Sequence, residues 1–197
     1  MAGPRDPPGP DVGQPRRDRE VASRAGRRAD QGPAPRSLGE ARDGRVSALT
    51  VRRAVSGDLR DILRLLADDH LGRDRDDPAN AEDAAYREAF AAIDADPNQF
   101  LGVAELDGAV VGTFQLSFLP GLSNRGALKV AIEAVRVDSA LRGGGYGGQM
   151  LSWAMDYARG RGCSGMQLKS HRSREGAHRF YERHGFRHSH VGMTRPL

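Results

Sequence analysis

The chain has 197 residues, of which 30 are lysine or arginine and 26 are aspartate or glutamate, and its formal net charge at pH 7 is +4. Ten arginines against seven acids give residues 1–47 a charge of +3, so the rest of the chain carries only +1, which excludes a strongly basic nucleic-acid surface there. A single cysteine, Cys163, excludes an intramolecular disulfide and is compatible with a reducing cytoplasm, and no apolar run is long enough to cross a bilayer.

Residues 1–47 differ in composition from everything that follows. They hold seven of the eleven prolines and ten arginines but almost no large apolar side chains. Such a segment cannot bury enough apolar surface to offset the entropy cost of ordering it. We therefore predict a disordered tail at residues 1–47, whose physiological translation the sequence leaves open. Residues 48–197 have the length of one domain with its own core.

Hydrophobic periodicity in the domain predicts alternating strands and helices. The first half is expected to form a strand, two helices and a β-hairpin, at residues 48–54, 59–68, 84–95, 100–106 and 110–118. Ser56 is the expected cap of the first helix. Asp107-Gly108 is a strong signal for the hairpin turn.

The second half is expected to continue as strand, helix, strand, helix and strand. These elements are predicted at residues 127–137, 149–158, 166–169, 174–184 and 189–194. Gly185 lies just past the last predicted helix, where glycine often ends a helix. The resulting order is β-α-α-β-β-β-α-β-α-β, which propensities alone define only as mixed α/β.

Residues 142–148 read Arg-Gly-Gly-Gly-Tyr-Gly-Gly and lie between a predicted strand and a predicted helix. Glycines let the backbone approach a ligand closely, and the N–H groups at a helix start point toward negative oxygens. The run therefore predicts a loop that binds a phosphate compound.

Two other types of phosphate-binding glycine loop fit this run less well. Gly143, Gly145 and Gly148 satisfy the G-x-G-x-x-G pattern of dinucleotide sites, but the acidic residue expected about 20 residues further on is missing. A Walker loop ends in Gly-Lys-Ser/Thr, and this run contains no lysine. A glycine-rich turn without a ligand stays open as the plain structural alternative.

Two blocks of sequence resemble a known family. Arg142-x-x-Gly145-x-Gly147 is similar to the R/Q-x-x-G-x-G/A signature of the GNAT N-acetyltransferases, and residues 177–186 resemble that family's A-x-x-x-Y-x-x-x-G-F segment, with Tyr181 at its tyrosine. The resemblance extends from about residue 50 to the end. It implies the GNAT fold, a mixed central sheet with flanking helices. It also implies acetyl-CoA as co-substrate and a direct transfer of the acetyl group to a primary amine in a ternary complex.

The same resemblance implies roles for individual residues. The pyrophosphate is expected on the backbone of the glycine loop, with Arg142 nearby; this loop comprises Gly143, Gly144, Gly145, Tyr146, Gly147 and Gly148. The backbone of Val135 and Val137 is expected to hold the pantetheine arm, and Tyr181 is expected to protonate the coenzyme sulfur. Many relatives carry asparagine seven residues before that tyrosine, where this chain has Arg174, which we assign to the adenosine 3′-phosphate or to the surface.

Acetyl transfer also needs a base, because a lysine-like amine has a pKa of about 10.4 and is mostly protonated at neutral pH. Glu133 is the candidate, since it lies on the strand before the glycine loop. Strand alternation predicts that Glu133, Val135 and Val137 share one face. A solvated or ion-paired carboxylate is the alternative.

The acceptor and partners are less constrained. Residues 68–74 lie where this family commonly lines its acceptor site, and their acids could attract a cationic amine. A small-molecule amine is favoured, with a protein lysine or N-terminus, or a noncatalytic acyl-CoA sensor, as alternatives. No metal is expected, because no cluster of acids or cysteines accompanies the histidines of the C-terminal region. We expect a cytoplasmic monomer or homodimer without a specific nucleic-acid or membrane partner.

Overall fold

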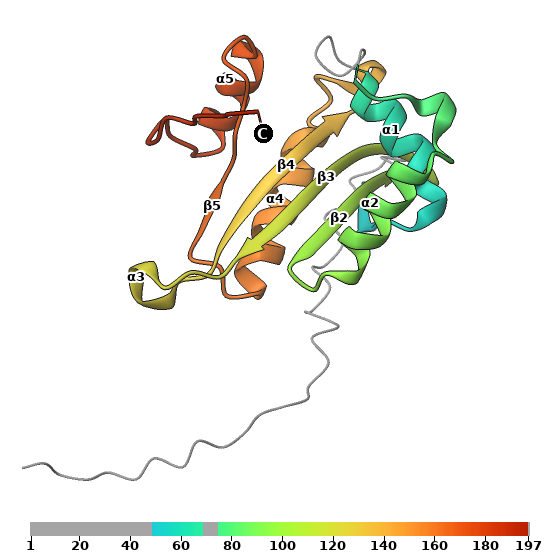
Figure 1. Cartoon of the computed structure of the whole chain (residues 1–197). Coiled ribbons are helices and arrows are strands. Elements are labelled where there is room, and N and C mark those ends of the chain that lie inside the picture. Colours follow the sequence, from blue (N-terminus) through green and yellow to red (C-terminus); the bar gives the residue numbers. More distant parts are fainter. Residues whose placement is uncertain (1–48, 69–74, 197) are drawn as a thin grey trace, which may run out of the picture.

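Five strands form one sheet in the computed structural model, which describes residues 49–68 and 75–196 (Figure 1). Their order across the sheet follows the chain: β1 Thr50–Arg53, β2 Gln99–Leu106, β3 Ala109–Leu119, β4 Lys129–Val137 and β5 Gly165–Gln167. The first three pairings are antiparallel, whereas β4 and β5 are parallel. The predicted mixed sheet is thus confirmed. The predicted tail at residues 1–47 lies outside the described residues, as do residues 69–74 of the expected acceptor loop.

Helices cover both faces of the sheet. The longer ones are α1 Leu59–Ala67, α2 Ala84–Ala95, α4 Tyr146–Gly160 and α5 Glu175–Arg183, and α3 Ser123–Gly126 is a single turn. Figure 1 shows α1 and α2 on one face and α4 behind the other, with α5 beyond β5. Parallel strands need such a crossover, and α4 supplies it between β4 and β5.

The core is divided by the sheet into two clusters. The larger one lies between the sheet and α4, and includes the fully buried Phe114, Ile132 and Met150. The smaller one lies between the sheet and the first two helices, around Ile62 and Val103. Alternation along the strands sends side chains to one cluster or the other, so each functional side chain can be assigned a face.

The start of α1 differs from its prediction. Ser56 does not cap the helix; it begins a short 3₁₀ turn, Ser56–Asp58, and Asp58 is the residue before α1. The Asp58 carboxylate accepts from the Val55 N–H at 2.8 Å and from both terminal nitrogens of Arg52, at 2.7 and 2.9 Å. An ionised acceptor forms stronger hydrogen bonds than a serine hydroxyl, and the buried carboxylate therefore organises this helix start.

The β-hairpin prediction is confirmed. Asp107 and Gly108 join β2 to β3 with φ values of 51° and 80°. Two positive φ values in a two-residue turn match the right-handed twist of the flanking strands. The predicted bounds of α2, residues 84–95, also agree with the structure.

The predicted last strand at residues 189–194 is wrong, because these residues form no strand. Val191 and Met193 alternate as strand residues do, yet they are 86% and 92% exposed. A strand needs a partner for its backbone hydrogen bonds. The edge strand β5 is only three residues long, so it offers little edge for pairing.

No helix among the described residues is both long and apolar enough to span a bilayer.

Candidate active site

A bulge interrupts β4 just before the glycine loop. Thr113 pairs with Arg136 and Gln115 pairs with Glu133, so two residues of β4 oppose the single Phe114 of β3. Ala134 adopts φ 53° at this point, a left-handed conformation that is uncommon outside glycine. A bulge of this kind adds one residue to a strand and changes which way the following side chains point.

The bulge overturns the predicted common face of Glu133, Val135 and Val137. Val135 and Val137 pack against the cluster under α4, the same cluster that buries Ile132. Glu133 follows Ile132 directly and therefore points to the opposite face, toward the side of α1 and α2. Simple alternation failed here because the extra residue at the bulge shifts the pattern by one.

Glu133 lies beside a group of polar side chains on that face. Its ladder partner Gln115 donates from Nε2 to Gln99 Oε1 at 3.0 Å, and Ser117 Oγ donates to the same oxygen at 2.8 Å. Glu133 itself is exposed to solvent. A carboxylate exposed in this way is accessible to water and to a bound amine.

β4 and β5 separate after a short contact. Their ladder covers only the pairs from Lys129–Gly165 to Ala131–Gln167. Within the described residues, the later part of β4 has no ladder partner on the β5 side, and Figure 1 shows β5 leading away from it toward α5. Backbone N–H and C=O groups at such a strand edge can bind an extended amide-containing ligand by strand-like hydrogen bonds.

The glycine loop forms the start of α4, as predicted, but the helix begins inside the glycine run at Tyr146. Gly143 and Gly145 have φ values of 88° and 82°, and a Cβ at either position would meet no atom within 4 Å. Gly145 is the cap residue and has no side chain to occupy the first N–H groups of the helix. These N–H groups therefore suit an anion such as a diphosphate.

The last two glycines of the loop have a packing role. A Cβ on Gly147 would lie 3.5 Å from the Phe180 ring, and a Cβ on Gly148 would lie 3.0 Å from His184 Nε2. Phe180 lies on α5, and His184 is the residue after this helix. His184 Nδ1 is hydrogen-bonded to the Phe180 carbonyl at 2.8 Å. The small residues thus let α5 pack directly on the first turn of α4, a reason for glycine that sequence reasoning missed.

Tyr181 lies on α5 between Phe180 and Phe186, with ring centroids 5.1 and 5.6 Å apart, respectively. Burial raises the pKa of its hydroxyl, while the positive charges of Arg136 and Arg174 act in the opposite direction. The phenol is therefore protonated at neutral pH and can donate a proton. Arg174 is the residue before α5 and Arg136 is on β4, donating from Nη1 to the Val135 carbonyl at 2.9 Å.

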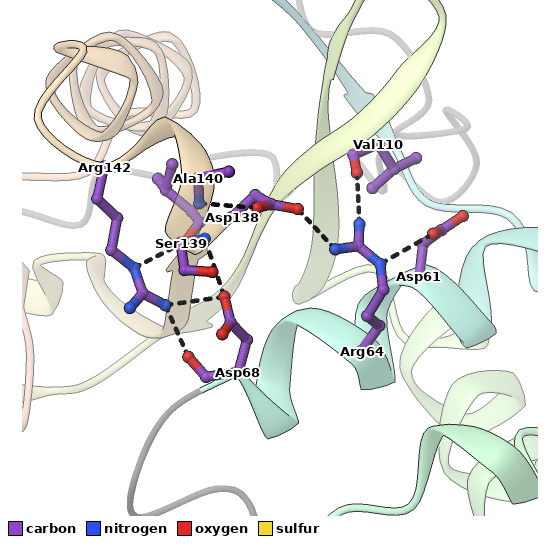
Figure 2. Close-up of polar contacts among 9 residues, drawn as sticks. Asp61, Arg64, Asp68, Val110, Asp138, Ser139, Ala140 and Arg142 are labelled. Carbon is purple, nitrogen blue, oxygen red and sulfur yellow. Dashed lines mark hydrogen bonds and ion pairs between the residues drawn. The ribbon is translucent and has the colours of Figure 1, made fainter.

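The Arg142 guanidinium forms hydrogen bonds to other residues of the protein. Its Nη2 donates to the Asp68 carbonyl at 2.7 Å and to the Asp68 carboxylate at 3.1 Å, while its Nε donates to the Val137 carbonyl at 3.1 Å (Figure 2). The same carboxylate oxygen accepts from the Ser139 N–H at 2.9 Å. Arg142 therefore ties the end of β4 to the end of α1.

A second arginine–aspartate bridge lies beside the first. Arg64 Nη1 donates to Asp138 Oδ2 at 2.6 Å, and its Nη2 donates to the Val110 carbonyl at 3.0 Å (Figure 2). Asp138 Oδ1 accepts from the Ala140 N–H at 3.1 Å. The Arg64 hydrogen bond, and then the one from Ala140, lower the pKa of Asp138. Sequence analysis missed both bridges because no local pattern shows which distant charges will meet.

Comparison with known proteins agrees with this geometry. Residues 59–186 match the model of the acetyltransferase (GNAT) family. The aminoalkylphosphonate N-acetyltransferase of Salmonella typhimurium is 36% identical over 113 residues, which cover 57% of this chain and 73% of that protein.

Solved structures have the same fold. A transcriptional regulator from Bacillus halodurans superposes with a TM-score of 0.73 at 40% identity, covering 76% of this chain and 99% of the other. The glucosamine-6-phosphate N-acetyltransferase of Arabidopsis thaliana reaches a TM-score of 0.62 at 21% identity, with coverage of 76% and 99%, and supports the fold alone. The chain belongs to the GNAT acetyltransferase family, whose members take their acetyl group from acetyl-CoA.

Proposed function

We propose that this protein acetylates the primary amine of a small molecule, with Tyr181 as general acid and Glu133 as general base. The observation that carries the proposal is the position of Tyr181. Its half-buried phenol lies on a helix that packs against the first turn of α4, next to the expected pyrophosphate site. A proton donor is thereby carried on the helix that packs against the end of the proposed coenzyme-binding loop.

The chemistry follows from the charges that change. Glu133 takes a proton from the ammonium form of the acceptor, directly or through water, and the freed amine attacks the thioester carbonyl. The new C–N bond forms as the C–S bond breaks, Tyr181 gives its proton to the leaving sulfur, and the acylated nitrogen releases its extra proton to solvent. Exchange with solvent then restores both residues. A positioned acid or base typically contributes about 10²–10⁴-fold to such a rate.

The remaining binding roles stay as predicted from the sequence. The backbone of residues 143–148 would take the pyrophosphate, and the edge of β4 at Val135 and Val137 would hold the pantetheine amides. Arg174 adds positive charge on the Tyr181 side.

The acceptor that we favour is a small amine that also carries an anionic group. Two observations support this class: the Salmonella relative is named for aminoalkylphosphonates, and the positive charge of Arg136 acts on the Tyr181 hydroxyl. Arginine suits phosphonate and carboxylate groups because its planar guanidinium can donate two parallel hydrogen bonds.

The test is a thiol-release assay with acetyl-CoA across aminoalkylphosphonates, amino acids, amino sugars, uncharged alkylamines and lysine peptides. We expect the fastest release with amines that bear a phosphonate or carboxylate. Tyr181→Phe should lower kcat by about 10²-fold or more while the Kd for CoA changes little.

Tyr157→Phe is the matched control. Tyr157 stacks on Trp153 in the core under α4, so loss of its hydroxyl should leave kcat near that of the wild type. Wild-type turnover in Tyr181→Phe would exclude the acid assignment. CoA binding without thiol release from any acceptor would favour the noncatalytic sensor.

A further inference from the structure

We propose that Arg142 is a positioning residue rather than a phosphate ligand, and that Asp68 is its partner in holding the glycine loop in its binding conformation. The proposal rests on the glycine loop being the coenzyme site, as proposed above. It assigns to Asp68, at the end of α1, a role in coenzyme affinity that the sequence motifs do not contain.

The Arg142 guanidinium is held by hydrogen bonds within the protein. Arg142 donates to the Asp68 carbonyl and carboxylate from Nη2, and to the Val137 carbonyl from Nε. The planar guanidinium therefore connects two segments of the chain, because Val137 is the last residue of β4 and Asp68 is the residue after α1. Turning this group toward a phosphate would break all of these contacts and leave the carboxylate of Asp68 uncompensated.

Asp68 also binds the backbone that precedes the glycine run. The oxygen that accepts from Arg142 also accepts from the Ser139 N–H. Ser139 begins the 3₁₀ turn Ser139–Leu141, which leads directly into the glycine run. The Leu141 carbonyl in turn accepts from the Gly144 N–H at 3.2 Å. Hydrogen bonds at the two ends of this turn therefore connect Asp68, through the turn, to the middle of the loop.

A glycine run needs support from the residues around it. Glycines have the largest conformational entropy to lose, so a run of them is held in one shape only by its surroundings. A loop already ordered before binding spares the ligand that cost, and affinity rises accordingly. Removing the Asp68–Arg142 bridge should thus weaken coenzyme binding without removing any group that touches the coenzyme.

The experiment compares Asp68→Asn, Arg142→Gln, Arg142→Lys and the double variant Asp68→Asn/Arg142→Gln in full-length protein, with CoA and 4′-phosphopantetheine as calorimetric ligands. We expect about a three- to tenfold higher Kd for CoA in each single variant and no further rise in the double, because both changes remove one shared interaction. 4′-Phosphopantetheine lacks the diphosphate bridge, and its Kd should change less.

The two roles of Arg142 predict opposite results for Asp68. If Arg142 were a phosphate ligand, Asp68→Asn would release it and tighten CoA binding, and Arg142→Lys would keep much of the affinity as a point charge. Either result overturns the proposal. Asp156→Asn is the control, since it removes a comparable exposed aspartate–arginine pair, with Arg159, on α4; it should leave the Kd unchanged.

Amide hydrogen exchange of the protein without ligand gives an independent readout. Asp68→Asn should speed exchange across residues 139–148 while α2 and β2 stay as protected as in the wild type. Unchanged exchange in this segment contradicts the proposal whether or not CoA binds. Failure of the wild type to bind CoA, with faster exchange in the variant, would instead refute the proposed coenzyme site alone.

Discussion

The glycine loop is held on its α1 side by charge and on its α5 side by packing. On the first side, two arginine–aspartate bridges join α1 to the end of β4 and the turn that follows. On the second side, Phe180 and His184 contact the first turn of α4 where Gly147 and Gly148 have no side chains. Ion pairs near the surface weaken as the salt concentration rises or the pH falls, whereas apolar packing does not. The two supports can therefore be separated experimentally.

Phe180→Ala should have the largest effect on the packing side. Phe180 contacts Tyr181 and His184, with ring centroids 5.1 and 4.5 Å apart, and packs against the main core cluster. We expect a loss of about 2 kcal/mol in the free energy of unfolding, below the range for a fully buried phenylalanine because Phe180 is half-buried. Displacement of Tyr181 should also lower kcat. Denaturant unfolding and the thiol-release assay measure the two effects.

The control for this variant is Phe180→Leu, which keeps an apolar side chain against Gly147. Its loss of stability should be smaller than that of Phe180→Ala. If both variants keep wild-type kcat, packing on this side does not position Tyr181.

Asp138→Asn tests the charge side and should have a smaller effect. We expect the free energy of unfolding to fall by about 0.5–1 kcal/mol at neutral pH, because Arg64 would then donate to a neutral amide oxygen instead of a carboxylate. The pKa of Asp138 is lowered in the folded protein, first by the Arg64 hydrogen bond. Its stabilising contribution is therefore present above the unfolded pKa of about 3.9 and disappears as the pH falls through the lower folded value.

The difference in unfolding free energy between wild type and Asp138→Asn should accordingly shrink from about pH 5 downward. The pKa of Asp58 is also lowered, by Arg52, but Asp58 is present in both proteins and its contribution cancels. Denaturant unfolding at several pH values measures the difference. A difference that stays constant down to about pH 2 would contradict the ionic role of Asp138.

Gly147→Ala should have the smallest effect, and of opposite sign. Its Cβ would lie at an ordinary contact distance of 3.5 Å from Phe180, and alanine in a helix is favoured over glycine by about 0.5–1 kcal/mol. We expect a small rise in Tm with CoA binding retained, since the family signature permits alanine at this position. Gly148→Ala is the matched comparison, because its Cβ would meet His184 Nε2 at 3.0 Å. A larger gain there would show that His184 does not restrict this turn.

Local patterns in the sequence were sufficient for much of the fold. Period-2 runs, the Asp107-Gly108 turn and the apolar stripes predicted the sheet, the hairpin and the helices, because these signals act over a few neighbouring residues. The motifs around Gly145 and Tyr181 also identified the family, because its members need those residue types at those spacings. The predicted roles of Tyr181, Glu133 and Arg174 remain predictions.

Other features were decided only when distant segments met. The bulge at Ala134 is a property of two strands paired in one register, and it moved Glu133 to a different face from Val135 and Val137. The last predicted strand was absent because a strand depends on an available partner edge, whatever its own pattern. Arg142 binds Asp68, more than 70 residues earlier in the chain. Propensity and periodicity describe what a segment can do alone, whereas pairing, burial and long-range ion pairs depend on what the fold places beside it.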